Sequence, residues 1–199
     1  DKEWERFYGN YIANANEGIV EKTRTIQDDH VKTLLRDDGT TKNIKLIDKN
    51  NIHNNRLQVL NQYEVSEDDG AKHDNRYDVT ILVNGLPLVH VELKRRGVAI
   101  REAFNQINRY QRDSFWSGCA LFEYVQIFII SNGTHTKYYS NTTRNAHLKE
   151  QNRKKKKGKK TSHSFEFTSY WSDANNIIIS DPVDFTKTYF SKHTILNIL

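Results

Sequence analysis

The chain contains a single cysteine, Cys119, and no methionine in its 199 residues. One cysteine excludes an internal disulfide framework and a zinc cluster built on several thiolates, and it fits a reducing cytoplasm. No apolar run approaches the roughly 20 residues that cross a bilayer, and no charged-then-apolar leader opens the chain. We therefore expect a cytoplasmic protein without a membrane partner. The missing methionine and the apolar, uncapped end HTILNIL lead us to expect a fragment of a longer chain.

Positive charge is concentrated in two segments, although the net charge of the chain is only +5. Residues 149–160 hold eight Lys or Arg against one Glu, and we predict a basic, flexible insertion at 149–163. This insertion could bind the DNA backbone without sequence preference, or it could simply be a solvated loop. The other segment is residues 94–112, in which Glu102 is the one acid. Its six basic residues are Lys94, Arg95, Arg96, Arg101, Arg109 and Arg112.

The pattern of apolar residues predicts one domain of ordinary size over residues 1–199. Helices are expected in pieces over residues 1–36, over the amphipathic stretch 98–115 and after Pro182. Strands are expected at 44–49, 56–65, 125–131, 135–140 and 165–171, with two more inside 75–97. This order of elements is typical of an α/β fold with a mixed central β-sheet flanked by helices.

The two strands expected inside NRYDVTILVNGLPLVHVELKRRG, residues 75–97, each carry a carboxylate where a core residue is expected. Asp78 lies in the first strand, and Glu92 and Lys94 share one face of the second, because side chains alternate along a strand. Asp78 joins that face only if the numbers of paired residues add up to an even value.

The length of the loop between these strands decides the register. A two-residue turn at 84–85 would place the two acids on opposite faces of the sheet. A three-residue loop at 84–86 would pair Val83 with Pro87 and set the acids against each other, and we predict this loop.

In that register the two carboxylates lie with Cβ atoms about 5 Å apart, where like charges repel unless a cation intervenes. Two hard oxygen ligands suit Mg²⁺ or Mn²⁺ better than zinc. Lys94 could orient or deprotonate a water molecule, or neutralise charge on a phosphoryl group. The pattern therefore indicates metal-assisted phosphodiester hydrolysis. The alternative is a surface hairpin whose polar face is merely solvated.

The helix expected next carries Gln106 and Tyr110, which lie four residues apart and so share a face near Arg101 and Arg109. An amide, a phenol and guanidinium groups suit contacts with phosphates and bases. The alternative is an ordinary helix edge with a half-buried tyrosine. Among the eight histidines, only His90 is well placed to act as a further ligand beside the acids.

Asp78, the run ELK at 92–94 and the pattern Q-x-x-x-Y at 106–110, followed by a buried strand, resemble the PD-(D/E)xK nuclease core with the extension found in RecB-like nucleases. The whole stretch 75–115, with FIISNGTHTKYYSNTTR, FEFTSYW and DFTKTYFSKHTILNIL, resembles the N-terminal endonuclease domain of the R (HsdR) subunit of type I restriction-modification enzymes. The likeness spans most of residues 40–199.

This resemblance implies roles for particular residues. Asp78 and Glu92 would be metal ligands together with the backbone carbonyl of Leu93, and Lys94 would be the catalytic lysine. The residues implied beside the site, where they contact DNA or help to position it, are Gln106, Tyr110, Arg95, Arg96 and Arg109.

The resemblance also implies a larger subunit, whose motor domains hydrolyse ATP and translocate DNA together with modification (HsdM) and specificity (HsdS) subunits. No G-x-x-x-x-G-K-[ST] motif occurs here, so ATP binding would belong to the missing part. Tyr77 replaces the proline of the family pattern. Glu17 and Glu21 are weak substitutes for the acidic residue of an earlier helix.

Two rival functions stay open. The chain could be a stand-alone RecB-like nuclease, which the chain's natural end near Leu199 would favour. It could also be an inactive module that binds DNA or docks a partner subunit. Metal binding separates this module from a nuclease.

Overall fold

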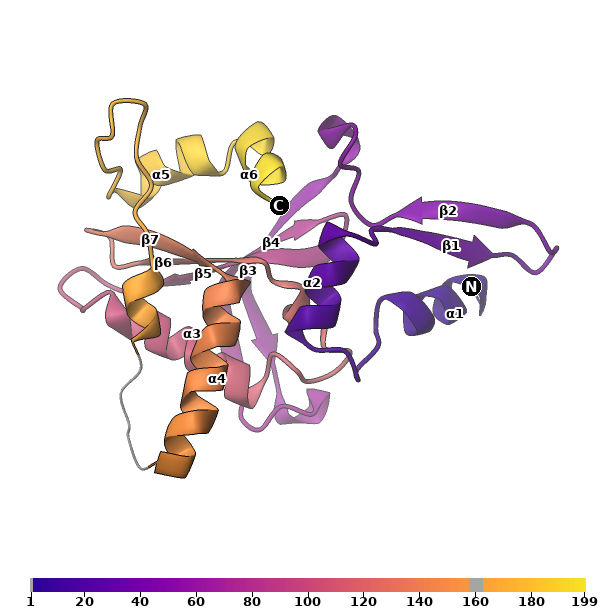
Figure 1. Ribbon diagram of the computed structural model, residues 1–199, viewed down its shortest axis with the longest axis horizontal. Helices are drawn as coiled ribbons and strands as arrows, with labels where there is room; N and C mark the ends of the chain where they lie inside the picture. The colour runs from indigo at the N-terminus through magenta and orange to yellow at the C-terminus, as the bar shows by residue number, and fades with distance from the viewer. Residues whose placement is uncertain (1, 158–162) are drawn as a thin grey trace.

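A computed structural model describes residues 2–157 and 163–199, with side chains described for 2–150 and 163–199 (Figure 1). Five strands form the main sheet, in the order β3-β4-β5-β6-β7, and two more form a separate hairpin. The strands are β1 Val31–Leu35, β2 Thr41–Lys45, β3 Leu57–Val65, β4 Asn75–Val83, β5 Leu86–Leu93, β6 Ile127–Ser131 and β7 Thr136–Ser140. The α-helices are α1 Lys2–Tyr11, α2 Ile19–Gln27, α3 Arg101–Asp113, α4 Asn141–Lys157, α5 Pro182–Tyr189 and α6 Lys192–Ile198.

The main sheet is mixed, as predicted. Neighbouring strands run antiparallel except β5 and β6, which are parallel. A parallel pair needs a long crossover connection, and α3 supplies it. The amphipathic helix that follows the hairpin is therefore held against the sheet beside β5.

Helices cover both faces of the main sheet, with α3 and α4 on one side and α5 and α6 on the other (Figure 1). One apolar cluster joins α1, α2, α5 and α6 to the sheet, and the second joins α3 to the opposite face. Ala103, Phe104, Ile107 and Tyr110 supply the α3 side, at the spacing of three and four that the sequence shows. No described helix has the length and apolar character needed to span a bilayer.

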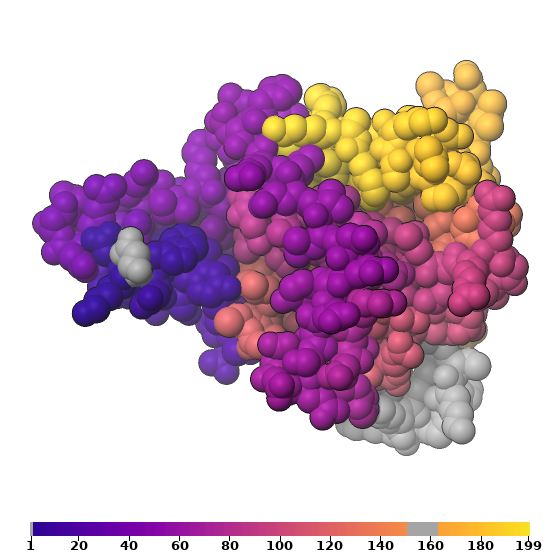
Figure 2. Space-filling view, turned by 180° about the vertical axis from the view of Figure 1, so that it is seen from behind, coloured from indigo at the N-terminus to yellow at the C-terminus, as the bar shows by residue number. Residues whose placement is uncertain are grey.

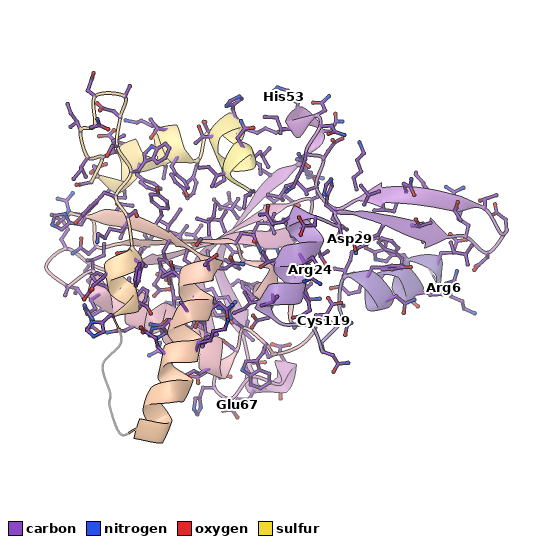
Figure 3. The ribbon with its side chains drawn as sticks, viewed as in Figure 1. Arg6, Arg24, Asp29, His53, Glu67 and Cys119 are labelled. Carbon is purple, nitrogen blue, oxygen red and sulfur yellow. The ribbon has the colours of Figure 1, made fainter. Side chains whose placement is uncertain are left out.

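The first 36 residues are not wholly helical, because β1 pairs with β2 in a hairpin beside α1. The segment VKTLL alternates exposed and half-buried residues, as strands do. Arg6 fastens α1 to this hairpin by donating hydrogen bonds to the carbonyl of Leu35 (3.1 Å) and the carboxylate of Asp37 (2.9 Å). Figure 3 shows Arg6 on α1 beneath the hairpin.

Residues 165–171 do not form the predicted strand. They begin with a short 3-10 helix, η4 Ser164–Phe167, and only Ser169 bridges β7, through Tyr138. The Thr168 hydroxyl donates to the carbonyl of Phe165 at 2.8 Å, and such local bonds compete with a strand ladder.

Residues 149–157 of the predicted insertion at 149–163 belong to α4. Lys, Arg and Gln are good helix formers. The helix is anchored at its start by buried Arg144 and His147, three residues apart on one face. Residues 158–162 of the predicted insertion lie outside the described residues.

The loop of the β4–β5 hairpin also differs from the prediction. Asn84 and Gly85 have φ values of 51° and 89°, and Val83 pairs with Leu86. These positive φ angles define a two-residue turn, the form that Asn-Gly favours. The predicted three-residue loop is therefore wrong.

A β-bulge nevertheless restores the register that the site requires. The pairing shifts by one residue between Ile81 and Leu82, which leaves Leu88 as the extra residue on β5. Beyond the bulge the paired numbers add up to an even value, so the register brings Asp78 opposite Glu92. The two acids therefore face each other, but this arrangement results from the bulge and not from the predicted three-residue loop.

The side chain of Asn84 ties the turn to the segment before β3. Its Oδ1 accepts the N–H of Arg56 at 2.8 Å, while its Nδ2 donates to the carbonyl of Leu46 (3.0 Å) and to Oδ1 of Asn55 (2.8 Å). Asn84 therefore supplies both the left-handed backbone and three hydrogen bonds.

Replacing Asn84 with Gly keeps the left-handed backbone and removes these three bonds. We expect the free energy of unfolding in urea to fall by about 3 kcal/mol, since each net hydrogen bond contributes about 1 kcal/mol. Asn176→Gly is the control, because Asn176 has φ 62° and no side-chain hydrogen bond within the described part of the chain. Equal losses in the two variants would contradict the assigned role of the Asn84 side chain.

Candidate active site

The Asp78 carboxylate accepts a hydrogen bond from the backbone of β5. Its Oδ2 accepts the N–H of Leu93 at 2.8 Å, which fixes the carboxylate beside Glu92. Burial raises the pKa of Asp78, and the charge of Glu92 raises it further, while the Leu93 N–H and the Lys94 ammonium oppose the rise. The carboxylate is therefore less stable in its ionised form than an ordinary surface aspartate.

A continuous chain of hydrogen bonds leads from Glu92 through α3. Lys94 Nζ lies 2.7 Å from Oε1 of Glu92 and 2.8 Å from Oε1 of Gln106. Gln106 Nε2 donates to the Tyr110 hydroxyl at 2.6 Å, and this hydroxyl donates to the carbonyl of Arg76 at 2.9 Å. The Glu92 side chain is only 1% exposed, so the ammonium compensates a buried charge.

The Tyr110 phenol stays protonated in this chain, because burial and the negative charge of Glu92 raise its pKa. It therefore acts as a fixed hydrogen-bond donor. The Gln106 carbonyl accepts a hydrogen bond from Lys94, and its amide donates one to the Tyr110 hydroxyl. Gln106 therefore holds the lysine in place, and Tyr110 holds Gln106.

His90 lies behind Glu92 in an aromatic cage. Its imidazole is fully buried and meets the rings of Tyr77, Tyr110, Phe115 and Phe128 at centroid distances of 5.5 to 6.4 Å. Its Nε2 lies 3.8 Å from Oε2 of Glu92, beyond hydrogen-bond distance.

Buried polar atoms gather behind the acid. Neither nitrogen of His90 has a hydrogen-bond partner among the described residues, and the same is true of Glu92 Oε2 and Thr80 Oγ1. Thr80 is the cross-strand partner of His90. Buried polar atoms without partners are rare because each one costs free energy.

A groove of about 330 Å³ opens beside the acids, lined by Asn61, Gln62, Asp78, Val79, Leu93, Lys94 and Arg95. Gln62 has φ 52°, and the β3–β4 pairing skips it together with Asp78. This interruption could not be predicted from the sequence, because the segment alternates like an ordinary strand.

The three predicted arginines differ in position. Arg95 lines the groove. Arg96 Nε donates to the carbonyl of Gly133 at 3.2 Å, in the turn between β6 and β7. The guanidinium carbon of Arg109 lies 5.8 Å from the centre of the Tyr110 ring. The structure thus brings together Asp78, Glu92, Lys94, Gln106 and Tyr110, with Arg95 at the rim.

Residues 1–147 match a family model described as "Type I restriction enzyme R protein N terminus". The chain belongs to this family. It is similar to the "Type I restriction enzyme EcoprrI endonuclease subunit" of Escherichia coli, with 49% identity over 199 residues, all of this chain and 58% of that protein. It is also 41% identical to the "Type I restriction enzyme SsaAORF53P endonuclease subunit" of Staphylococcus saprophyticus over 189 residues.

These relatives of the type I R-protein family are longer than this chain. The chain spans 58% of the Escherichia coli relative and 17% of the Staphylococcus saprophyticus relative. A more distant relative, the "Putative type I restriction enzyme MjaIXP endonuclease subunit" of Methanocaldococcus jannaschii, is 32% identical over 117 residues, or 57% of this chain and 11% of that protein.

The donor set of this R-protein site fits a hard cation. No three His, Cys, Asp or Glu side chains in the described part of the chain converge in a way that could hold a metal ion. Mg²⁺ needs only one or two carboxylates, with water and substrate phosphates as its other ligands. Asp78 and Glu92 meet this need, and the buried Oε2 of Glu92 has no hydrogen-bond partner among the described residues. Leu93 as a carbonyl ligand stays a prediction.

The two earlier acids serve other purposes. Glu17 pairs with buried Lys22 at 3.1 Å, and Glu21 accepts the N–H of Gly18 at 3.1 Å at the start of α2. Both carboxylates thus stabilise the α2 region, so the suggestion that either substitutes for a family acid is not supported.

We expect Asp78→Asn to raise the free energy of unfolding at pH 7, measured in urea without metal. A carboxyl whose folded pKa is raised costs stability above that pKa, and this cost disappears below the unfolded pKa of about 3.9. The gain should therefore vanish by pH 3.

Asp48→Asn is the control with the opposite sign. Hydrogen bonds from Asn54, Asn51 and Lys45 lower the pKa of Asp48, so its charge stabilises the fold above the unfolded pKa. The Asp48 variant should lose stability at pH 7 and match the parent protein in strong acid. A loss of stability in Asp78→Asn at pH 7 would contradict the assigned environment.

Replacing His90 with Phe, or Thr80 with Val, should leave the fold at least as stable, with a gain of about 1 kcal/mol. Each change removes buried polar atoms without partners and keeps a similar shape. Thr136→Val is the matched control, because the buried Thr136 hydroxyl is bonded to Ser131 Oγ at 3.0 Å and its loss should destabilise. Thermal and urea unfolding test the set, and a large loss in His90→Phe would show that the imidazole has a stabilising partner.

Proposed function

We propose that this chain is the endonuclease part of a type I restriction enzyme R subunit and hydrolyses phosphodiester bonds of duplex DNA with Mg²⁺ or Mn²⁺. The observation that carries this proposal is the opposition of Asp78 and Glu92 across β4 and β5, with the Lys94 ammonium on Glu92. Membership of the R-protein family and the endonuclease names of its relatives support the same chemistry.

Asp78 and Glu92 would hold the divalent ion, with the Leu93 carbonyl as a third ligand. When bound, such an ion polarises a phosphoryl oxygen and lowers the pKa of a coordinated water molecule. The bond from the Leu93 N–H fixes Asp78 in advance, and this preorganisation reduces the cost of forming the site.

Lys94 would neutralise charge that develops on the phosphoryl group. Its amine is held by Glu92 and Gln106, and only 20% of its side chain is exposed, so it is restrained before substrate arrives. Fixed charges in a partly dry site stabilise a transition state more strongly than mobile ones. Gln106 and Tyr110 act as positioning residues for this lysine.

The groove beside the acids suits a DNA backbone. It carries the guanidinium of Arg95 and the amides of Asn61 and Gln62, which can contact phosphates without distinguishing bases. We therefore propose cleavage without sequence reading by this domain.

The full subunit would couple this cleavage to ATP-driven translocation through motor domains outside this chain. Modification and specificity subunits would supply sequence recognition. The greater length of the relatives leaves room for such parts.

Glu92→Gln and Lys94→Met should each lower DNA cleavage by the assembled full-length enzyme by at least about 100-fold, while ATP hydrolysis stays unchanged. Loss of a charged catalytic group typically costs two to four orders of magnitude. Calorimetry with Mn²⁺ should show binding to the parent protein and none to Asp78→Ala.

Glu64→Gln and Lys42→Met are the matched controls, because both residues are exposed and lie outside the site. They should cleave DNA normally. Normal cleavage by Glu92→Gln would refute the nuclease assignment. Equal Mn²⁺ binding by the parent and Asp78→Ala would identify an inactive module instead.

A further inference from the structure

Two cations and two aromatic rings alternate beside the site. The guanidinium carbon of Arg101 lies 4.5 Å from the centre of the Phe165 ring. Lys137 Nζ lies 5.1 Å from the same ring and 4.8 Å from the Tyr170 ring. We call Arg101, Phe165, Lys137 and Tyr170 the cation–aromatic ladder. It joins the start of α3, β7 and the segment around η4.

The cations of the ladder have no acidic partner within the described part of the chain. Lys137 bonds only to Thr168, at 3.0 Å to the hydroxyl and 3.4 Å to the carbonyl, both uncharged. Glu166, the carboxylate of η4, faces His163 at 3.2 Å instead. Partial burial lowers the pKa of Lys137, as expected for an ammonium without a counter-ion.

Aromatic faces attract cations and restrict their movement, so the two charges are ordered without being neutralised. Arg101 is exposed, and Lys137, Phe165 and Tyr170 are half-buried, so a ligand can reach the ladder. Ordered, accessible and uncompensated cations favour binding of a polyanion, because little entropy is lost when the contact forms.

The ladder lies on the same sheet face as the acids. Glu92 pairs with Ile130, and Ile130 pairs with Lys137, so the ladder stands two strands away from Glu92. Strands lie about 4.8 Å apart, which gives a separation of about 10 Å between the backbones. One DNA strand carries a phosphate for about every 3.4 Å of helix axis and also winds around that axis, so this separation corresponds to at most about three nucleotides.

We propose that the cation–aromatic ladder binds the backbone of the DNA strand within about three nucleotides of the bond that is cut, an inference that rests on the proposed function. The groove with Arg95 lies toward β3, and the ladder lies toward β7. The substrate would therefore run across the end of the sheet, with the acids between its two contacts.

The test compares two double variants of the full-length protein with the same change in charge. Arg101→Gln with Lys137→Gln removes the ladder cations. Arg36→Gln with Lys42→Gln removes two exposed cations of the β1–β2 hairpin. This hairpin lies at the other end of the molecule from the segment that follows β5 and leads into α3, where the ladder begins (Figure 2). Binding to a short non-specific duplex is measured in EDTA over a range of salt concentrations.

The ladder variant should bind more weakly, and its plot of log K against log salt should be less steep by about 1.8, since each phosphate contact contributes about 0.9. The hairpin variant should match the parent protein. An unchanged slope in the ladder variant would overturn the proposal. So would a loss of thermal stability with normal DNA binding, which would identify the ladder as a clasp between α3 and η4.

Binding in EDTA needs no cleavage, so this result is independent of the nuclease assignment. If Glu92→Gln cut DNA normally while the ladder variant showed the predicted weaker salt dependence, the proposed active site would fail and the DNA contact would stand.

Discussion

The register between β4 and β5 is the constraint on which the site depends. Each strand alternates its side chains between two covered faces, so a shift of one residue would move Asp78 away from Glu92. The bulge at Leu88 sets this register, and the Leu93 N–H then fixes the Asp78 carboxylate. The hydrogen-bond chain through Lys94, Gln106 and Tyr110 begins at Glu92, on the same face of the sheet.

The same arrangement places several unfavourable interactions close together. A buried glutamate, a partly buried aspartate and an imidazole without hydrogen-bond partners lie together beside well-packed aromatic rings. Lys94 pairs with Glu92, and the Leu93 N–H donates to Asp78. Sites that bind ligands or catalyse reactions commonly keep such costs, which the rest of the fold must offset. Here the offset comes from two apolar clusters, one on each face of the sheet.

Sequence patterns predicted the mixed sheet and the amphipathic α3, because these depend on spacing within continuous segments. The acids were also expected beside Lys94, Gln106 and Tyr110, but through a loop that the structure does not have. Sequence patterns failed where a distant contact decides the outcome. Asn-Gly favours the two-residue turn that the structure has, but a three-residue loop was predicted instead, because the bulge that restores the register was not foreseen. Thr168 ended the last expected strand through a local bond. The cation–aromatic ladder joins residues from three separate segments, so no spacing could reveal it.

Asp78 is hydrogen-bonded to the backbone N–H of Leu93, so the site places little constraint on the side chain in the middle of the Glu92-Leu93-Lys94 run. The site uses the backbone of residue 93, while its side chain is 45% exposed on the other side of the strand. Almost any side chain can therefore stand between the acid and the lysine. Proline is the exception, since it has no N–H to donate. Residue 93 thus contributes to the site through its backbone amide.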